Sequence, residues 1–204
     1  FVKAGGYRTP EYWSEEGWGW RTFRNAKWPH FWRVKGPEGL HDYRLRLPFH
    51  ETESLPLDLP AEVNAHEARA FAKWYGQDTR LTTEAEYHLM TTHSTKNEDL
   101  SSVGCREKGI NTCLAYGSPS AVDPECARGN VWQWCEDDFA ALPGFEPHYL
   151  YDDFSSPCFD GQHTVIKGAS FVSTCDEASV YARFHFRPHF HQHAGFRLTK
   201  QKPL

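Results

Sequence analysis

Imidazole and guanidinium side chains are concentrated in one stretch near the end of the chain, Arg183–Leu198, which reads RFHFRPHFHQHAGFRL. Imidazoles bind metals and exchange protons near neutral pH, and guanidinium groups pair with carboxylates. This composition indicates the wall of a pocket for a small polar ligand. For each single histidine, a role in packing or capping is the alternative. The residues concerned are His185, His189, His191, His193, Arg183, Arg187 and Arg197.

The same stretch has the pattern of two strands around a loop. Residues 184–187 alternate between phenylalanine and a polar side chain, which is the period of a strand. Pro188 interrupts the alternation, a loop follows over residues 189–193, and residues 194–198 return to strand character. Such an arrangement would hold the imidazoles between two fixed ends.

Three of these histidines alternate along the loop and suggest a metal site. If the segment were extended, His189, His191 and His193 would face one ion. We do not expect a metal site in this chain, because three histidines on a loop that follows a proline need not converge, and we keep such a site as the alternative.

Bulk composition excludes several classes of function. The chain has 204 residues and a formal net charge of −5, which gives nucleic-acid binding no electrostatic support. The sequence contains neither an apolar run of about 18 residues nor a charged-then-apolar leader. We therefore expect one cytoplasmic domain without a membrane or nucleic-acid partner.

The cysteines do not form a recognisable structural motif. None of the six belongs to a C-x-x-C pair, so a zinc knuckle is not expected. In a cytosolic protein we expect them to be mostly reduced thiols.

Two helices are marked by capping residues at their starts. The first begins at Asn64 in a variant of the capping box and ends before Gly76. The second begins at Thr83 in a T-x-x-E box and ends near Thr92. Their apolar faces are expected to belong to the core rather than to a functional site.

The rest of the chain predicts short strands and long loops. Strand character is strongest over residues 44–47, 129–137 and 164–171. Residues 7–32 are expected to form an aromatic loop with at most a short helix near residues 10–16. Helices followed by short strands predict an α+β fold with two helices and an unusually large loop fraction.

Several spaced motifs resemble one known superfamily. They are GNVWQW at 129–134, KGASF at 167–171, AR at 182–183 and GFR at 195–197. In this order they resemble the formylglycine-generating-enzyme and sulfatase-modifying-factor superfamily, and the likeness covers nearly the whole chain. The resemblance implies a C-type-lectin-like fold, formed as a single domain over residues 1–204.

One branch of this superfamily does not fit. The formylglycine-generating enzymes bind copper with two cysteines whose places are taken here by Ser173 and Ala178. Soft copper needs thiolates, and Cys175 does not restore the spacing. Gln133 also stands where this branch has an acidic residue, which weakens its calcium site. We therefore do not expect formylglycine generation.

A finer resemblance connects the chain with the sulfoxide synthases of thiol-histidine biosynthesis. The runs YWSEEGW, LAYGSPSAV, GNVWQWCEDDF, LYDDFSSPCFDG and ARFHFRPHFHQHAGFRL look like the ovothiol-type 5-histidylcysteine sulfoxide synthases. The ergothioneine-type relatives match less closely. The resemblance implies a non-heme iron(II) enzyme that uses O2 to join the sulfur of cysteine to an imidazole carbon of histidine.

The resemblance also implies a partner domain. In these enzymes three histidines of a preceding, helical DinB-like domain bind the iron. No such domain is present in this chain, so we expect it to be an N-terminally truncated piece or a separate subunit. The iron(II) would then be supplied mainly by the DinB-like domain, in cis or in trans.

Candidate site residues follow from the resemblance and from substrate chemistry. By motif, Tyr151 best fits the family's active-site tyrosine, with Tyr149 as its rival, and a phenol there could donate a proton. Guanidinium groups suit substrate carboxylates, carboxylates and aromatic faces suit ammonium groups, and polar side chains suit an imidazole. The substrate-binding candidates are Arg183, Arg187, Asp152, Phe190, His189, His191 and Gln192. Arg183 would equally suit a buried structural role.

Two other functions remain as alternatives. One is a non-catalytic lectin-like domain that binds a small ligand or a protein. The other is a self-contained metalloenzyme that uses the histidines at 189, 191 and 193.

Overall fold

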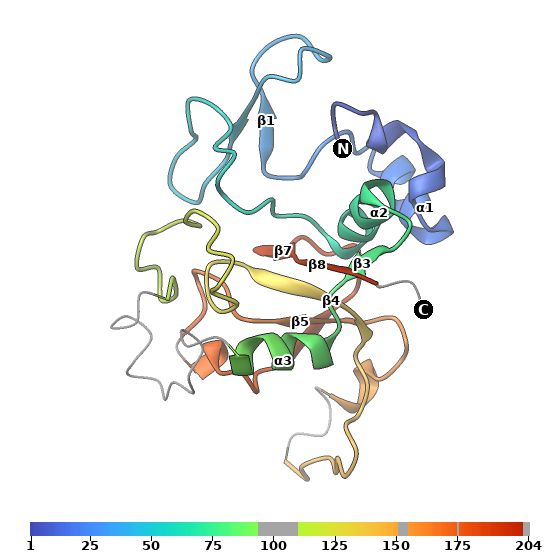
Figure 1. Cartoon of the computed structure of the whole chain (residues 1–204), viewed down its shortest axis with the longest axis vertical. Helices are drawn as coiled ribbons and strands as arrows, with labels where there is room; N and C mark the ends of the chain where they lie inside the picture. The colour runs from blue at the N-terminus through green and yellow to red at the C-terminus, as the bar shows by residue number, and fades with distance from the viewer. Residues whose placement is uncertain (94–109, 151–154, 175, 202–204) are drawn as a thin grey trace.

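A four-stranded sheet forms the centre of the computed structural model (Figure 1). Its strand order is β6-β5-β4-β7. β4 (Trp132–Asp138) pairs antiparallel with β5 (Thr164–Lys167) and parallel with β7 (Ala194–Phe196). β5 pairs antiparallel with β6 (Phe184–Phe186). The structure describes residues 1–93, 110–150, 155–174 and 176–201.

Two smaller sheets complete the strand topology. β1 (Trp32–Val34) pairs with β2 (Tyr43–Leu45), and β3 (Thr79–Leu81) pairs with β8 (Leu198–Lys200), both antiparallel. The single closing strand expected at 194–198 is therefore wrong, because this segment contributes to β7 and β8 in two different sheets. Arg197 lies at the junction between them.

Both predicted helices are confirmed together with their caps. Before α2 (Ala65–Tyr75), Asn64 Oδ1 accepts a hydrogen bond from the Glu67 backbone N–H at 2.9 Å, and Glu67 Oε2 accepts one from the Asn64 N–H at 2.9 Å. Thr83 and Glu86 form the same reciprocal pair, at 3.2 and 2.9 Å, at the start of α3 (Glu84–His93). These bonds satisfy N–H groups that have no partner within the helix.

A third helix, α1 (Glu15–Phe23), corrects the expectation of two helices and of an aromatic loop over residues 7–32. The short 3-10 turns η1 (Gly6–Arg8) and η2 (Pro10–Tyr12) precede it. Two glycines, Gly17 and Gly19, make α1 difficult to recognise as a helix in the sequence. At Gly17 the chain packs closely against α2, since a Cβ there would lie 3.3 Å from the Cβ of His66.

The main core lies between the central sheet and α2. Trp134 is completely buried there with Ile166, Ala68 and Leu81. Its indole N–H donates to the Val63 carbonyl at 2.8 Å, so the largest core side chain is also a polar tie to the segment before α2. This packing fixes the position of β4 relative to α2.

The GNVWQW segment enters β4 through a left-handed turn. Gly129 and Asn130 both have φ of 70°. A Cβ at Gly129 would lie 2.7 Å from the Asn111 carbonyl oxygen, so only glycine fits.

The α+β class and the C-type-lectin-like architecture are confirmed, with short strands and long connections that include the 3-10 turns η4 (Ser156–Cys158) and η5 (Asp176–Ala178). None of the helices in the described residues is long and apolar enough to span a membrane.

Candidate functional site

The histidine loop, residues 189–193, crosses from one edge of the central sheet to the other. It connects β6 with β7, which are separated by β5 and β4 rather than lying side by side. At its start the Pro188 carbonyl accepts a hydrogen bond from Ala65 N at 3.0 Å. At its end the His193 carbonyl accepts one from Trp132 N at 2.8 Å. The loop is therefore fixed to the first residue of α2 and to the first residue of β4.

His191 is held by aromatic packing. Its ring stacks on His30, with centroids 4.3 Å apart, and meets the edge of Trp20 on α1 at 5.9 Å. Burial, followed by the charges of His30 and Arg24, lowers the pKa of His191 to about 4. The imidazole is therefore neutral at physiological pH and can donate or accept a hydrogen bond there.

His193 is held by a carboxylate and two rings. Its Nδ1 donates to Glu62 Oε1 at 2.6 Å, and the Glu62 side chain is only 3% exposed. Phe31 stacks on the His193 ring at 5.5 Å, and Phe171 meets it edge-on at 4.7 Å. This imidazole has a structural partner on each side.

The remaining loop candidates are more accessible. His189 is exposed and stacks on Phe190, with centroids 4.8 Å apart, and Phe190 is itself 46% exposed. Gln192 is half-buried. Their positions allow contact with a ligand or with another domain.

The three alternating histidines do not surround one point. Within the described residues, those at 189, 191 and 193 do not bring their ligand atoms within 4.8 Å of one another. Each has its own ring partner instead. In this arrangement the loop does not fit a shared iron ion.

A basic recess of about 340 Å³ opens beside His191. It collects three cationic side chains next to aromatic faces and two carboxyl groups. Lys27 already pairs with Glu38 at 2.6 Å, so a ligand carboxylate would pair with Arg24 or Arg33, while a ring could lie on the tryptophans. The recess is lined by residues that include Trp20, Arg24, Lys27, Trp28, His30, Arg33, Glu38, Glu67 and His191.

The two candidate arginines flank β6, Arg183 before it and Arg187 after it, and their surroundings differ. Arg183 forms a fork with Glu84, at 2.7 and 3.0 Å, and stacks over Phe139 at 4.9 Å. Arg187 is 43% exposed, and it donates to Gln162 Oε1 at 2.6 Å and lies 3.5 Å from Asp160 Oδ2. Arg183 is thus held by a structural partner and largely buried, whereas the Arg187 side chain is more accessible.

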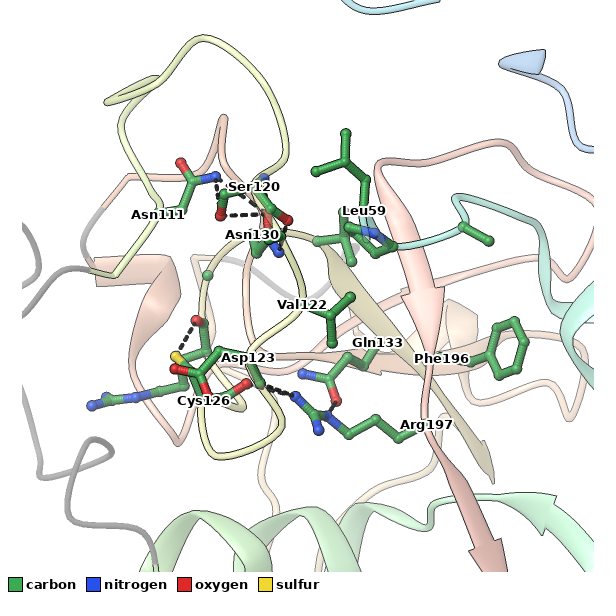
Figure 2. Close-up of a pocket in the computed structure, with 16 residues that line it drawn as sticks. Leu59, Asn111, Ser120, Val122, Asp123, Cys126, Asn130, Gln133, Phe196 and Arg197 are labelled. Carbon is green, nitrogen blue, oxygen red and sulfur yellow. Dashed lines mark hydrogen bonds between the residues drawn. The ribbon is translucent and has the colours of Figure 1, made fainter. Parts of the chain in front are cut away.

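A second pocket of about 390 Å³ lies over the GNVWQW turn (Figure 2). The Arg197 guanidinium points to Gln133 Oε1 at 2.9 Å and to the Cys126 carbonyl at 2.6 Å. Asn130 Oδ1 accepts from Ser120 N at 2.7 Å. These bonds connect the GNVWQW and GFR motifs with residues 120–126, the segment before β4. The motif residues concerned therefore stabilise the fold.

The positions of the copper thiolates are structural in this chain. Ser173 is buried, and its Oγ accepts a hydrogen bond from the Ser170 N–H at 3.1 Å. Ala178 is buried in the main core. Neither position offers a metal ligand of the copper-binding type.

Tyr151, Asp152 and Cys175 lie outside the described residues. Tyr149, the rival of Tyr151, is exposed and stacks on His148 at 4.8 Å.

Sequence reasoning missed the residues that hold the histidine loop from outside. Trp20, His30 and Glu62 contact it from segments more than 130 positions earlier. Local periodicity carries no information about such distant pairs. The clustering of tryptophans over residues 13–32 indicated that this segment packs against another part of the chain. It did not indicate that the histidine loop is that part.

Known proteins resemble this chain over most of its length. A model of the sulfatase-modifying factor enzyme 1-like domain matches residues 1–202. A hercynine oxygenase of Mycobacterium tuberculosis is 31% identical over 188 residues, which cover 84% of this chain and 42% of the relative. A hercynine oxygenase of Mycolicibacterium thermoresistibile is 29% identical over 196 residues, covering 86% and 42%. The chain therefore spans about two fifths of the length of these curated relatives.

A solved structure supports the fold alone. PvdO from Pseudomonas aeruginosa superposes with a TM-score of 0.50 at 13% identity, covering 90% of this chain and 75% of that chain.

Proposed function

Because the chain belongs to the family of the sulfatase-modifying factor enzyme 1-like domain, we propose that it is the substrate-pocket domain of an iron- and O2-dependent sulfoxide synthase. The reaction would join the sulfur of cysteine to an imidazole carbon of histidine and oxidise that sulfur, as in ovothiol biosynthesis. The observation that carries the oxygenase part of the proposal is the similarity to hercynine oxygenases over 84% of the chain, whereas the choice of the ovothiol type rests on sequence motifs alone.

The local chemistry of the chain is consistent with a pocket for amino acids. The recess at His191 gathers cations beside aromatic rings, and Arg187, which lies outside this recess beside Asp160, offers a separate accessible guanidinium for a carboxylate. The neutral imidazole of His191 is a hydrogen-bond partner for a substrate imidazole. We propose these groups as binding groups, and Tyr151 as the proton donor.

We assign the iron to a second, helical domain. When bound, iron(II) would supply the activation of O2. The histidine loop of this chain does not fit that ion, since its imidazoles are held apart by separate partners. The contribution of this chain is to bind and orient cysteine and histidine and to exclude water.

The ergothioneine-type reaction is the second candidate. It is favoured by the curated relatives, which are named hercynine oxygenases. The ovothiol type is favoured by the closing stretch and by the LYDDFSSPCFDG run. The two proposals differ in the substrate, which is histidine in one and its trimethylammonium derivative, hercynine, in the other.

A competition experiment separates these possibilities. The chain is joined to the DinB-like domain of an ovothiol-type enzyme and supplied with iron(II), O2, cysteine and equal amounts of histidine and hercynine. We expect the mass of a histidine-derived sulfoxide as the main product. A hercynine-derived product would establish the ergothioneine type instead. Binding of either compound without any product would indicate a non-catalytic binding domain.

A further inference from the structure

A second cluster of metal-binding side chains lies on the other side of the central sheet from α2. Cys158, His163 and His185 each offer one ligand atom, and the three atoms lie within 4.8 Å of one another. In a tetrahedral zinc site, ligand atoms at normal bond lengths are about 3.5 Å apart. Only a small movement would therefore bring the three atoms onto one ion.

Strand register brings the two histidines together. Val165 on β5 pairs with His185 on β6, and His163 precedes Val165 by two residues. Side chains two positions apart point to the same face of a strand, so His163 and His185 are diagonal neighbours. Their ring centroids lie 5.1 Å apart, and the ring planes are at 88°. The sheet itself, rather than a flexible loop, sets this spacing.

A carboxylate orients His163 from behind. His163 Nδ1 donates to Asp160 Oδ1 at 2.9 Å, which leaves Nε2 as the nitrogen with the lone pair. Arg187 in turn lies 3.5 Å from Asp160 Oδ2. The arrangement of carboxylate, histidine and ligand position is the one that metal sites use to fix the tautomer of a ligand.

The side of the cluster that faces away from Asp160 is apolar. Phe139 stacks on His185 at 4.1 Å, and Cys158 and Phe159 pack against the buried group Cys135, Phe139 and Val165. Apolar packing on this side limits the access of competing water.

We propose that Cys158, His163 and His185 form a site for a zinc-type divalent cation, distinct from the iron of the proposed reaction. One thiolate with two imidazoles suits Zn²⁺ and excludes Mg²⁺ and Ca²⁺, which prefer oxygen ligands. Three protein ligands leave a fourth position for water or a small ligand. The ion would join the connection between β4 and β5 to the edge strand β6.

The test uses the reduced chain after removal of metals with a chelator. Zn²⁺ is added under anaerobic conditions, unbound metal is removed by dialysis, and the zinc content is measured by elemental analysis. We expect about one Zn²⁺ per chain and a higher midpoint of thermal unfolding. Co²⁺ in place of zinc should give a thiolate-to-cobalt charge-transfer absorption. Without any retained zinc, the site does not exist and the proposal is wrong.

Variants locate the ion. Cys158→Ser should abolish the charge-transfer absorption, and His163→Ala should weaken zinc binding by about 100-fold or more. Asp160→Asn, which keeps all three ligands, should weaken it about 10- to 100-fold. The matched controls Cys126→Ser and His148→Ala should retain the full zinc content. If Cys158→Ser and Asp160→Asn bind zinc as the unaltered chain does, the ion lies elsewhere and the assignment fails. The outcome is independent of the proposed function, because no turnover is measured.

Discussion

Glu62 and His193 are joined by a hydrogen bond of 2.6 Å although they are separated by 131 positions. Glu62 lies just before α2, and His193 ends the histidine loop. Since the carboxylate is nearly buried, its hydrogen bond to the imidazole contributes both to stability and to the position of the loop.

Removing the imidazole should therefore destabilise the fold. We expect His193→Ala to lower the free energy of unfolding by about 1–3 kcal/mol, because the buried Glu62 carboxylate loses its donor. His193→Asn places an amide N–H near the position of Nδ1 and should recover a large part of the loss. Urea denaturation measures both. Equal destabilisation by the two variants would show that ring packing, not the hydrogen bond, holds the loop.

Arg183 should act on stability rather than on substrate binding. Its fork with Glu84 joins two side chains that are only 18% and 13% exposed. Arg183→Ala leaves the Glu84 carboxylate with a weakened set of partners and should cost about 3 kcal/mol. In a double-mutant cycle with Glu84→Ala, the two effects should be strongly non-additive. Additive losses would mean that the two side chains do not act as a pair.

Arg187 should show the opposite behaviour. Because it is 43% exposed, its ion pair with Asp160 contributes little to stability. In the chain joined to the DinB-like domain, we expect Arg187→Ala to raise the KM for an amino-acid substrate about tenfold or more, with an unchanged unfolding midpoint. Arg187→Lys keeps the charge but loses the planar guanidinium, so its KM should lie between the values for the unaltered chain and for Arg187→Ala. An unchanged KM in Arg187→Ala would remove this residue from the substrate pocket.

The buried carboxyl of Glu67 should make stability depend on pH. Burial raises its pKa to about 7, against the hydrogen bonds from Tyr7 and from the Asn64 backbone. Since the folded pKa exceeds the ordinary value of 4.5, the stability that this group contributes is complete below pH 4.5 and is lost as the pH rises to 7.

The variant Glu67→Gln tests this relation directly. Glutamine can complete the capping box with Asn64 and can bond to the Tyr7 hydroxyl. Between pH 4.5 and 7, the stability of the Glu67→Gln protein should therefore change less than that of the unaltered chain. Thermal unfolding at a series of pH values measures this difference. If the unfolding midpoints of the two proteins changed with pH in parallel, the pH dependence would not come from Glu67.

Local signals in the sequence determined which helices could be predicted. The caps at Asn64 and Thr83 are formed by residues three positions apart, so α2 and α3 were recognisable. α1 was missed because it contains two glycines, of which Gly17 serves a contact with α2 that only the folded chain shows. Its own cap, Ser14 accepting from Gly17 N at 3.1 Å, lacks the acidic residue of a capping box.

The candidate site was harder to predict because its contacts are distant in sequence. The alternation at residues 184–187 was correct, and it places His185 on the face that meets Phe139. The pairing of that face with His163 depends on the register of β5 and β6, which the sequence does not specify. The separation of the loop histidines likewise results from Glu62, His30 and Phe31, which lie far upstream.

The most direct test of the proposed function measures product formation from separated halves. This chain, the DinB-like domain of an ovothiol-type enzyme, and the two together are each given iron(II), O2, cysteine and histidine, and the sulfoxide is detected by mass spectrometry. We predict product only when both halves are present, since one binds the iron and the other forms the substrate pocket. Product from this chain alone would contradict the assignment of iron to another domain. Product from the DinB-like domain alone, at the same rate as from the mixture, would contradict the role of this chain in the pocket.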